Sequence, residues 1–289
     1  MVCGGDWLKD LPHPDPPLTK GRGRGEHEEQ MTSKRVILAI AGSDPSGGAG
    51  VQADLKTFSD LGVEGISAIT AITAQDEEHV LAIHPTPADV LTQQLSTACN
   101  GREIAAVKIG MVATKANARA IAWFLKRIDA LHVVIDPVLH SSSGSALLEA
   151  DALPFYRQHL LPLATVITPN IPEASALAGM QVAGLDTMQK AAEVIHRETI
   201  RMREKSTKPL AVIVKGGHLE GDAVDVLFDG EKYHSFTAPR IALAGRSPRG
   251  TGCRFASAIA AHLAKGENLS TAVSRAKDYL AWYIEKAAQ

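Results

Sequence analysis

Gly250, Thr251, Gly252 and Cys253 form the segment of this sequence whose residue types bear most directly on chemistry. The two glycines let consecutive backbone N–H groups point at one spot, and the apolar pattern that follows predicts a helix whose N-terminal dipole adds positive potential there. Such a loop is suited to a phosphate group in transfer, with the thiol beside it. Glycine and threonine are also ordinary helix-capping residues, so the segment alone leaves a purely structural helix start open.

A second glycine-rich loop follows the apolar run at 36–41, which predicts a buried strand. Residues 42–50 contain four glycines, which indicates close approach of the backbone to another group. The loop has neither the Gly-Lys-Ser/Thr ending of a Walker A loop nor the third glycine of a dinucleotide-binding fingerprint. The helix predicted after it carries Asp54 in its first turns, where a carboxylate either complements the helix dipole or binds a ligand.

Composition indicates a soluble enzyme of one α/β domain. With 289 residues and 45% hydrophobic content, the chain can bury a sizeable core. A net charge of −2 gives no broad basic surface, so we expect no nucleic-acid partner. No apolar run is long enough to span a bilayer, so we expect no membrane partner either. Three scattered cysteines predict neither a disulfide framework nor a zinc site, and they indicate a reducing, cytoplasmic location.

The first thirty residues differ from the rest because they are rich in proline, Arg-Gly pairs and charge and show no periodicity. We interpret residues 1–33 as a disordered tail, with Met31 as a possible start of translation. The folded domain is expected at 34–289.

Strand and helix patterns alternate from residue 36 onward, which predicts a mainly parallel sheet with helices on both faces. We expect buried strands at 105–109, 132–135, 165–168 and 210–214, helices at 86–98 and 114–125, an antiparallel hairpin of 223–228 with 232–236, and two closing helices. Ligands bind beyond the carboxyl ends of strands in such sheets. That edge gathers the polar and glycine positions Gly42, Gly110, Asp136, Asn170, Lys215 and Gly250.

Six blocks of the sequence together resemble the hydroxymethylpyrimidine and phosphomethylpyrimidine kinases of thiamin biosynthesis, which belong to the ribokinase-like superfamily. The blocks lie at 41–58, 69–75, 108–111, 168–173, 215–218 and 250–253, in the family's order and spacing, and the resemblance runs from about Val36 to Ala287. It implies a ribokinase-like three-layer αβα fold, ATP and Mg²⁺ as cofactors, a small-molecule substrate that is a hydroxymethylpyrimidine or its monophosphate, and a homodimer.

The resemblance also implies roles for individual residues. Cys253 is the candidate catalytic base, because a helix N-terminus lowers the pKa of a thiol, and Gly250, Thr251 and Gly252 surround the transferred phosphoryl group. Asn170, Glu173 and Lys215 are implied at the nucleotide phosphates, and Asp136 and Glu173 at the metal. The implied substrate contacts are Gly42, Asp54, Gln75 and Met111.

Two stretches depart from the family pattern and keep alternatives open. Arg249 and Arg254 flank the glycine–cysteine segment, where they are expected either to bind nucleotide phosphates or to form salt bridges elsewhere. Acidic residues at 76–78 follow Gln75 and make the mouth of the expected pocket more negative. These departures favour a catalytically weak ligand-binding relative as one alternative. A pyridoxine or pyridoxal kinase is another, because some of those kinases share the Gly-Thr-Gly-Cys form.

Overall fold

The computed structural model describes residues 35–76, 78–128, 130–141, 143–204, 208–217, 221–241 and 249–287. The expected tail at 1–33 therefore lies outside the described residues. The strands are β1 (Arg35–Ser43), β2 (Glu64–Gln75), β3 (Val80–Pro85), β4 (Glu103–Ile109), β5 (His132–Ile135), β6 (Val166–Ile167), β7 (Ala211–Val214), β8 (Ala223–Phe228) and β9 (Tyr233–Ala238). The α-helices are α1 (Gly50–Asp60), α2 (Ala88–Cys99), α3 (Lys115–Leu125), α4 (Ala152–Phe155), α5 (Ile171–Ala178), α6 (Leu185–Met202), α7 (Thr251–Ala264) and α8 (Leu269–Ala287), and short π and 3₁₀ turns span Tyr156–Leu160 and Leu161–Leu163.

One sheet runs through the described part of the molecule in the order β3-β2-β1-β4-β5-β6-β7-β8-β9. The strands from β2 to β7 in this order are paired in parallel, whereas β3 at one edge and β8 and β9 at the other are antiparallel to their neighbours. The predicted parallel sheet and the hairpin of β8 with β9 are therefore confirmed. The carboxyl ends of β1, β2 and β4 to β7 share one edge, where a site is expected.

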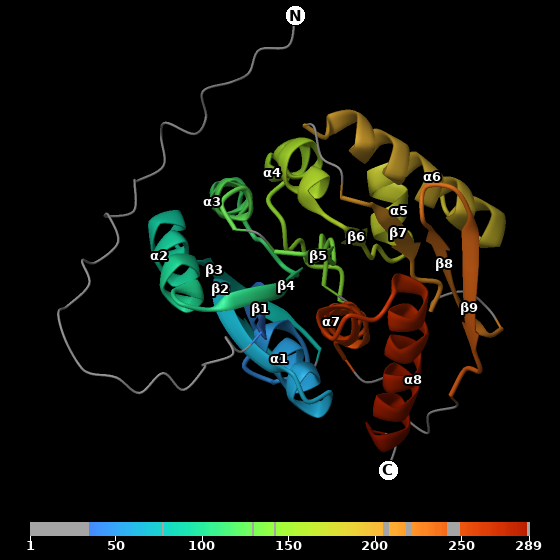
Figure 1. The fold of residues 1–289 in the computed structure, drawn as a ribbon, viewed down its shortest axis with the longest axis horizontal. Helices are drawn as coiled ribbons and strands as arrows, with labels where there is room; N and C mark the ends of the chain where they lie inside the picture. The colour runs from blue at the N-terminus through green and yellow to red at the C-terminus, as the bar shows by residue number, and fades with distance from the viewer. Residues whose placement is uncertain are drawn as a thin grey trace, which may run out of the picture.

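Helices cover both faces of the sheet, which gives the predicted three layers (Figure 1). Strand β1 shows why: Leu38 and Ile40 pack into the core under α2, α3, α5 and α6, while Ile37 and Ala39 pack under α1, α7 and α8. Successive side chains of a strand point to opposite faces, so a strand covered on both sides is apolar at every position.

Helices α3 and α2 differ in how they begin. The Thr114 hydroxyl accepts a hydrogen bond from the Asn117 amide at the start of α3, the helix that the sequence predicted at 114–125. Helix α2 differs, because its N-cap is Pro87 and no side chain caps it. None of the described helices combines the length and apolar character that crossing a membrane would require.

Candidate active site

A cavity of about 530 Å³ opens at the edge formed by the strand ends. Along the sheet it is lined by Gln75 at the end of β2, Gly42 in β1, Met111 after β4, Asp136 after β5, Asn170 after β6, Lys215 after β7 and Asp225 in β8. Helix α7 reaches the cavity with Gly250, Thr251, Gly252 and Cys253 and packs on β4 and β5, near the middle of that order. The sequence predicted this convergence, although Gly110 is not one of the lining residues.

The two glycine-rich loops meet at the start of α7. Gly250 has a φ of 69°, and a Cβ there would lie 2.1 Å from the carbonyl oxygen of Gly48. Gly50 has a φ of 60°, and a Cβ there would lie 2.3 Å from the carbonyl oxygen of Gly42. Only glycine fits both the dihedral and the space. The loop at 42–50 therefore holds the N-terminus of α7 against the cavity. The free backbone N–H groups of this helix start can bind an anion there.

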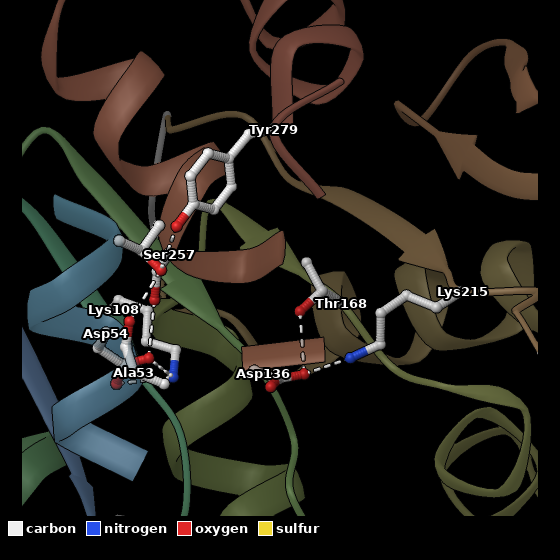
Figure 2. Close-up of polar contacts among 9 residues, drawn as sticks. Ala53, Asp54, Lys108, Asp136, Thr168, Lys215, Ser257 and Tyr279 are labelled. Carbon is white, nitrogen blue, oxygen red and sulfur yellow. Dashed lines mark hydrogen bonds and ion pairs between the residues drawn. The ribbon is translucent and has the colours of Figure 1, made fainter. Parts of the chain in front are cut away.

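Lys215, Asp136 and Glu173 form a charged cluster on the cavity wall. The Lys215 ammonium donates to Asp136 Oδ1 at 2.5 Å, and the Thr168 hydroxyl donates to the same oxygen at 3.3 Å (Figure 2). A Cβ on Gly252 would lie 3.1 Å from Lys215 Nζ, which puts this cation at the first turn of α7. Burial, reinforced by the neighbouring Asp136 carboxylate, raises the pKa of Glu173 to about 7. The cluster thus joins a phosphate-binding helix start to two carboxylates.

The Asn170–Glu173 pair fixes one of those carboxylates in place. The Asn170 side chain accepts from the Glu173 amide at 2.9 Å, and Glu173 Oε2 accepts from the Asn170 amide at 2.8 Å, which is a capping box for α5. Two cavity-lining carboxylates fit Mg²⁺, because this ion binds through one or two carboxylates together with phosphate oxygens and water. The described residues hold no group of three or more histidine, cysteine, aspartate or glutamate side chains that would suit a closed metal site.

Cys253 lines the cavity in the first turn of α7, but its protonation differs from the prediction. Burial raises the pKa of the thiol to about 11, and this outweighs the opposing effects of Lys108 and Lys215. The expected lowering by the helix dipole was therefore wrong for the ligand-free protein. The thiol is protonated at neutral pH in this state, so activity as a base requires a change in the surrounding charge when ligands bind.

Gln75, Met111 and Gly42 line the part of the cavity near β2, β1 and β4. A Cβ on Gly42 would lie 2.9 Å from Met111 Sδ, so the thioether lies directly over this glycine. Burial is outweighed by neighbouring donors, Gln75 among them, which lower the pKa of Asp44, and the Asp44 carboxylate accepts from the Ala49 amide at 2.8 Å. Because a carboxylate only accepts, Gln75 can present its amide group toward Asp44 and its carbonyl oxygen toward a ligand.

Asp54 does not reach this cavity, contrary to its predicted role as a substrate contact. Its side chain is fully buried and is not one of the lining groups. Lys108 donates to its two oxygens at 2.7 and 2.9 Å, and the Ser257 hydroxyl donates at 2.8 Å. An exposed helix-start carboxylate and a buried one look alike in sequence, so the signal that separates them is the lysine in β4.

The two arginines that flank the glycine–cysteine segment lie in different places. Arg249 lines the cavity and donates to the carbonyl oxygen of Asp76, in the acidic loop after β2. Arg254 is 2% exposed, does not line the cavity, and stacks on the Tyr283 ring at 4.0 Å from its centroid. The alternative in which Arg254 binds nucleotide phosphates is therefore wrong in this geometry, whereas Arg249 remains a candidate.

Sequence reasoning missed two features of the wall. Asp44 lies within the first glycine-rich loop, where an acid among turn residues is a usable signal. Asp225 accepts from Lys277 at 2.7 Å and from the Gly216 amide at 3.0 Å, and both charged side chains line the cavity. Lys277 comes from α8, far along the chain from any glycine-rich motif, so no local pattern marks it.

Comparison with known proteins identifies the family. A family model for phosphomethylpyrimidine kinase matches residues 44–289. This chain belongs to the phosphomethylpyrimidine kinase family. It is also similar to the hydroxymethylpyrimidine/phosphomethylpyrimidine kinase of Rhizobium meliloti, with 47% identity over 85% of this chain and 88% of the relative. The predictions of the family and of a phosphotransferase activity on hydroxymethylpyrimidine or phosphomethylpyrimidine are confirmed.

Solved structures of kinases share the fold. The crystal structure of phosphomethylpyrimidine kinase from Clostridium difficile 630 matches with a TM-score of 0.73 and 37% identity, over 87% of this chain and all (100%) of the other. The Staphylococcus aureus pyridoxal kinase in complex with AMP-PCP and pyridoxal matches with a TM-score of 0.75 and 33% identity, over 86% and 87% of the two chains. The ribokinase-like fold of this phosphomethylpyrimidine kinase family member is therefore confirmed, and pyridoxal kinases are its structural neighbours.

Proposed function

We propose that this enzyme transfers the γ-phosphoryl group of ATP, bound with Mg²⁺, to 4-amino-5-hydroxymethyl-2-methylpyrimidine and to its monophosphate. The observation that carries this proposal is the order of groups along the sheet edge. Gln75, Gly42 and Met111 lie at β2, β1 and β4, while Asp136, Asn170 and Lys215 lie at β5, β6 and β7. Helix α7 packs on β4 and β5, where the two sets of residues adjoin. An acceptor held by the first set and a nucleotide held by the second would therefore meet at Cys253.

The pyrimidine set suits an aminopyrimidine ring. The carbonyl oxygen of Gln75 can accept from the ring's 4-amino group when its amide group faces the Asp44 carboxylate. The Met111 thioether packs well against an aromatic face. With the ring held this way, the hydroxymethyl oxygen is the group presented toward α7.

The transfer step assigns a role to each remaining group. The α7 backbone N–H groups and the Lys215 ammonium stabilise the transferring phosphoryl group, and Asn170 positions Glu173 beside it. When bound, Mg²⁺ neutralises phosphate charge, and Asp136 and Glu173 are the residues that would hold it. The Cys253 thiolate takes the hydroxyl proton as the acceptor oxygen bonds to phosphorus and the bond to ADP breaks.

A coupled ADP-release assay tests this proposal. The substrates are the hydroxymethylpyrimidine, its monophosphate, pyridoxine and pyridoxal, and nucleotide-only reactions provide the blank. We expect turnover with the two pyrimidines. Turnover only with the pyridines would assign the enzyme as a pyridoxal kinase, which is the alternative favoured by its structural neighbours. Ligand binding without any turnover would indicate a binding protein.

Gln75→Leu distinguishes the two substrate classes within one protein. The variant leaves the ring's amino group without its acceptor, which costs about 1 to 3 kcal/mol, or about tenfold or more in kcat/KM, for the pyrimidine. Pyridoxal turnover serves as the internal control and should hardly change if that ring is held by stacking. Equal losses on both substrates would remove Gln75 as the group that recognises the pyrimidine.

We also propose a homodimer in the cytoplasm. Exposed apolar side chains on the β2–β3 edge support the dimer, since Ile72 is 61% and Leu81 75% exposed. Both described cysteines, Cys99 and Cys253, are free, which supports a reducing compartment. Light scattering of the full chain at micromolar concentration tests the assembly, and a monomer mass would overturn it.

A further inference from the structure

A buried trio of charged and polar side chains lies behind the cavity and takes no part in the site as described so far. Lys108 from β4 and Asp54 from α1 are both fully buried, and Lys108 Nζ lies 2.7 Å from Asp54 Oδ1. Ser257 from α7 donates to the same oxygen at 2.8 Å (Figure 2). Placing two ions in the interior is costly even when they are paired, so replacement by apolar side chains is often neutral or stabilising. Stability alone therefore gives a weak reason for this pair.

The trio is linked to the thiol through α7. Ser257 lies four residues after Cys253, and residues at this spacing share one face of a helix. Cys253 therefore lies on the cavity side of the Ser257 contact, one turn closer to the N-terminus. A Cβ on Gly110 would lie 3.0 Å from Lys108 Nζ, which places the ammonium close to the backbone beyond the end of β4, just before the cavity-lining Met111.

Four charged groups act on the Cys253 thiol from the elements around it. Lys108 from β4 and Lys215 after β7 lower its pKa, whereas Asp136 after β5 and Asp54 from α1 raise it. Lys108 has the largest effect of the four, behind only burial. Burial lowers the pKa of Lys108, but the carboxylates of Asp54 and Asp136 help to raise it above its usual value, so this lysine keeps its charge across the working pH range.

We propose that Lys108, held in place by Asp54 and Ser257, is a positioning residue whose buried positive charge stabilises the thiolate of Cys253 during phosphoryl transfer. This inference rests on the proposed function, in which the thiolate accepts the hydroxyl proton. Once bound ligands have changed the surrounding charge, the thiol loses its proton to solvent. The sulfur then takes the proton of the substrate hydroxyl as the acceptor oxygen bonds to phosphorus and the bond to ADP breaks. Lys108 exchanges no proton and touches no substrate, since it lies behind the cavity wall.

The test measures thiolate formation without any substrate. Cys253 is alkylated with iodoacetamide across a pH series, and peptide mass spectrometry reports the rate at this cysteine separately from the others. In the double variant D54N/K108M, no buried charge is left unpaired, so the fold should survive. We expect the double variant to raise the pKa of Cys253 by about half a unit or more. At pH values below that pKa, alkylation of Cys253 should then be about threefold slower or more, because half a pKa unit changes the thiolate fraction about threefold. An unchanged profile in the folded double variant would overturn the proposal.

Asp54→Asn alone provides a second variant with the opposite expected sign. It keeps the size of the side chain and an oxygen that can accept from Ser257, but it removes the negative charge that offsets Lys108. We expect Cys253 to be alkylated faster than in the wild type, because Asp136 and the forming thiolate still favour the charged form of Lys108. If the Lys108–Asp54 pair had a purely structural role, both variants would change the alkylation rate of Cys253 in the same direction. That result would also overturn the proposal. Lys190→Met, on the exposed surface of α6, is the control and should leave the profile unchanged.

Turnover measurements separate this inference from the proposed function. We expect the double variant to lower kcat with the preferred substrate by about threefold or more while KM stays within about twofold, because Lys108 acts only through the thiolate. If Cys253→Ala left turnover unchanged, the proposed base would be wrong, whatever the alkylation profiles showed. If Cys253→Ala abolished turnover but the profiles of both Lys108–Asp54 variants matched the wild type, only the role of Lys108 would fall.

Discussion

Two lysine–aspartate pairs lie at the carboxyl ends of the parallel strands, and they differ in what surrounds them (Figure 2). In the Lys108–Asp54 pair, both side chains are 0% exposed and the lysine contacts both carboxylate oxygens. In the Lys215–Asp136 pair, the side chains are 13% and 3% exposed and both line the cavity. The first pair is closed to ligands, whereas the second can exchange its contacts for phosphate or metal. A lysine–aspartate pair can therefore be a fixed part of the structure or part of a binding site, depending on whether it is open to the cavity.

Removing the lysine from each pair should show this difference most strongly in stability. Lys108→Met leaves Asp54 buried without its cation, which is expected to cost about 3 to 5 kcal/mol of unfolding free energy. Lys215→Met should cost much less, about 1 kcal/mol, because cavity water can hydrate Asp136. Urea unfolding of the two ligand-free variants measures both values. Equal losses would show that access to the cavity does not distinguish the pairs.

Cys253→Ala tests the cavity side of the comparison without disturbing either pair. The phosphoryl-transfer rate should fall by about a hundredfold or more, which is the usual loss when a general base is removed. ADP affinity, measured by calorimetry, should hardly change because the anion-binding groups of α7 are backbone N–H groups. Cys253→Asp should recover part of the activity if the thiolate acts as a base. A stable phosphocysteine detected by mass spectrometry would contradict direct transfer.

Glu173, which lies beside the Lys215–Asp136 pair, provides a prediction about how stability depends on pH. Burial and Asp136 raise its pKa from 4.5 to about 7 in the folded protein. The folded state therefore holds a proton that the unfolded state lacks between these pH values, so the ligand-free protein should lose stability as pH rises through this range. Urea unfolding at several pH values, compared with Glu173→Gln, measures the effect. The variant should show a flatter dependence, and an equal slope in both proteins would assign the effect to another group.

The sequence predicted the sheet and its ligand-binding edge better than it predicted side-chain access. Strand β5 spans the predicted residues 132–135, and α3 begins directly after Thr114, where its helix was predicted, because these signals depend only on neighbouring residues. Asp54 and Arg254 were assigned to ligands wrongly, because their true partners, Lys108 and Tyr283, are distant in the chain. The predicted lowering of the Cys253 pKa was wrong for a related reason, because burial raises this pKa and burial depends on packing that no local motif records.

Arg254→Met should have the smallest effect and sharpens the contrast with a cavity residue. Arg254 is buried, and its Nε and one Nη have no hydrogen-bond partner among the described residues. Losing its stacking on Tyr283 costs about 0.5 to 2 kcal/mol, whereas removing unpaired buried donors returns about 1 to 3 kcal/mol. The two effects nearly cancel, so unfolding free energy should change by less than about 1 kcal/mol. The KM for ATP should stay within about twofold, because the side chain does not line the cavity. Arg249→Met, which alters a lining residue, should raise that KM several-fold, and a larger effect from Arg254 than from Arg249 would reverse the assignment.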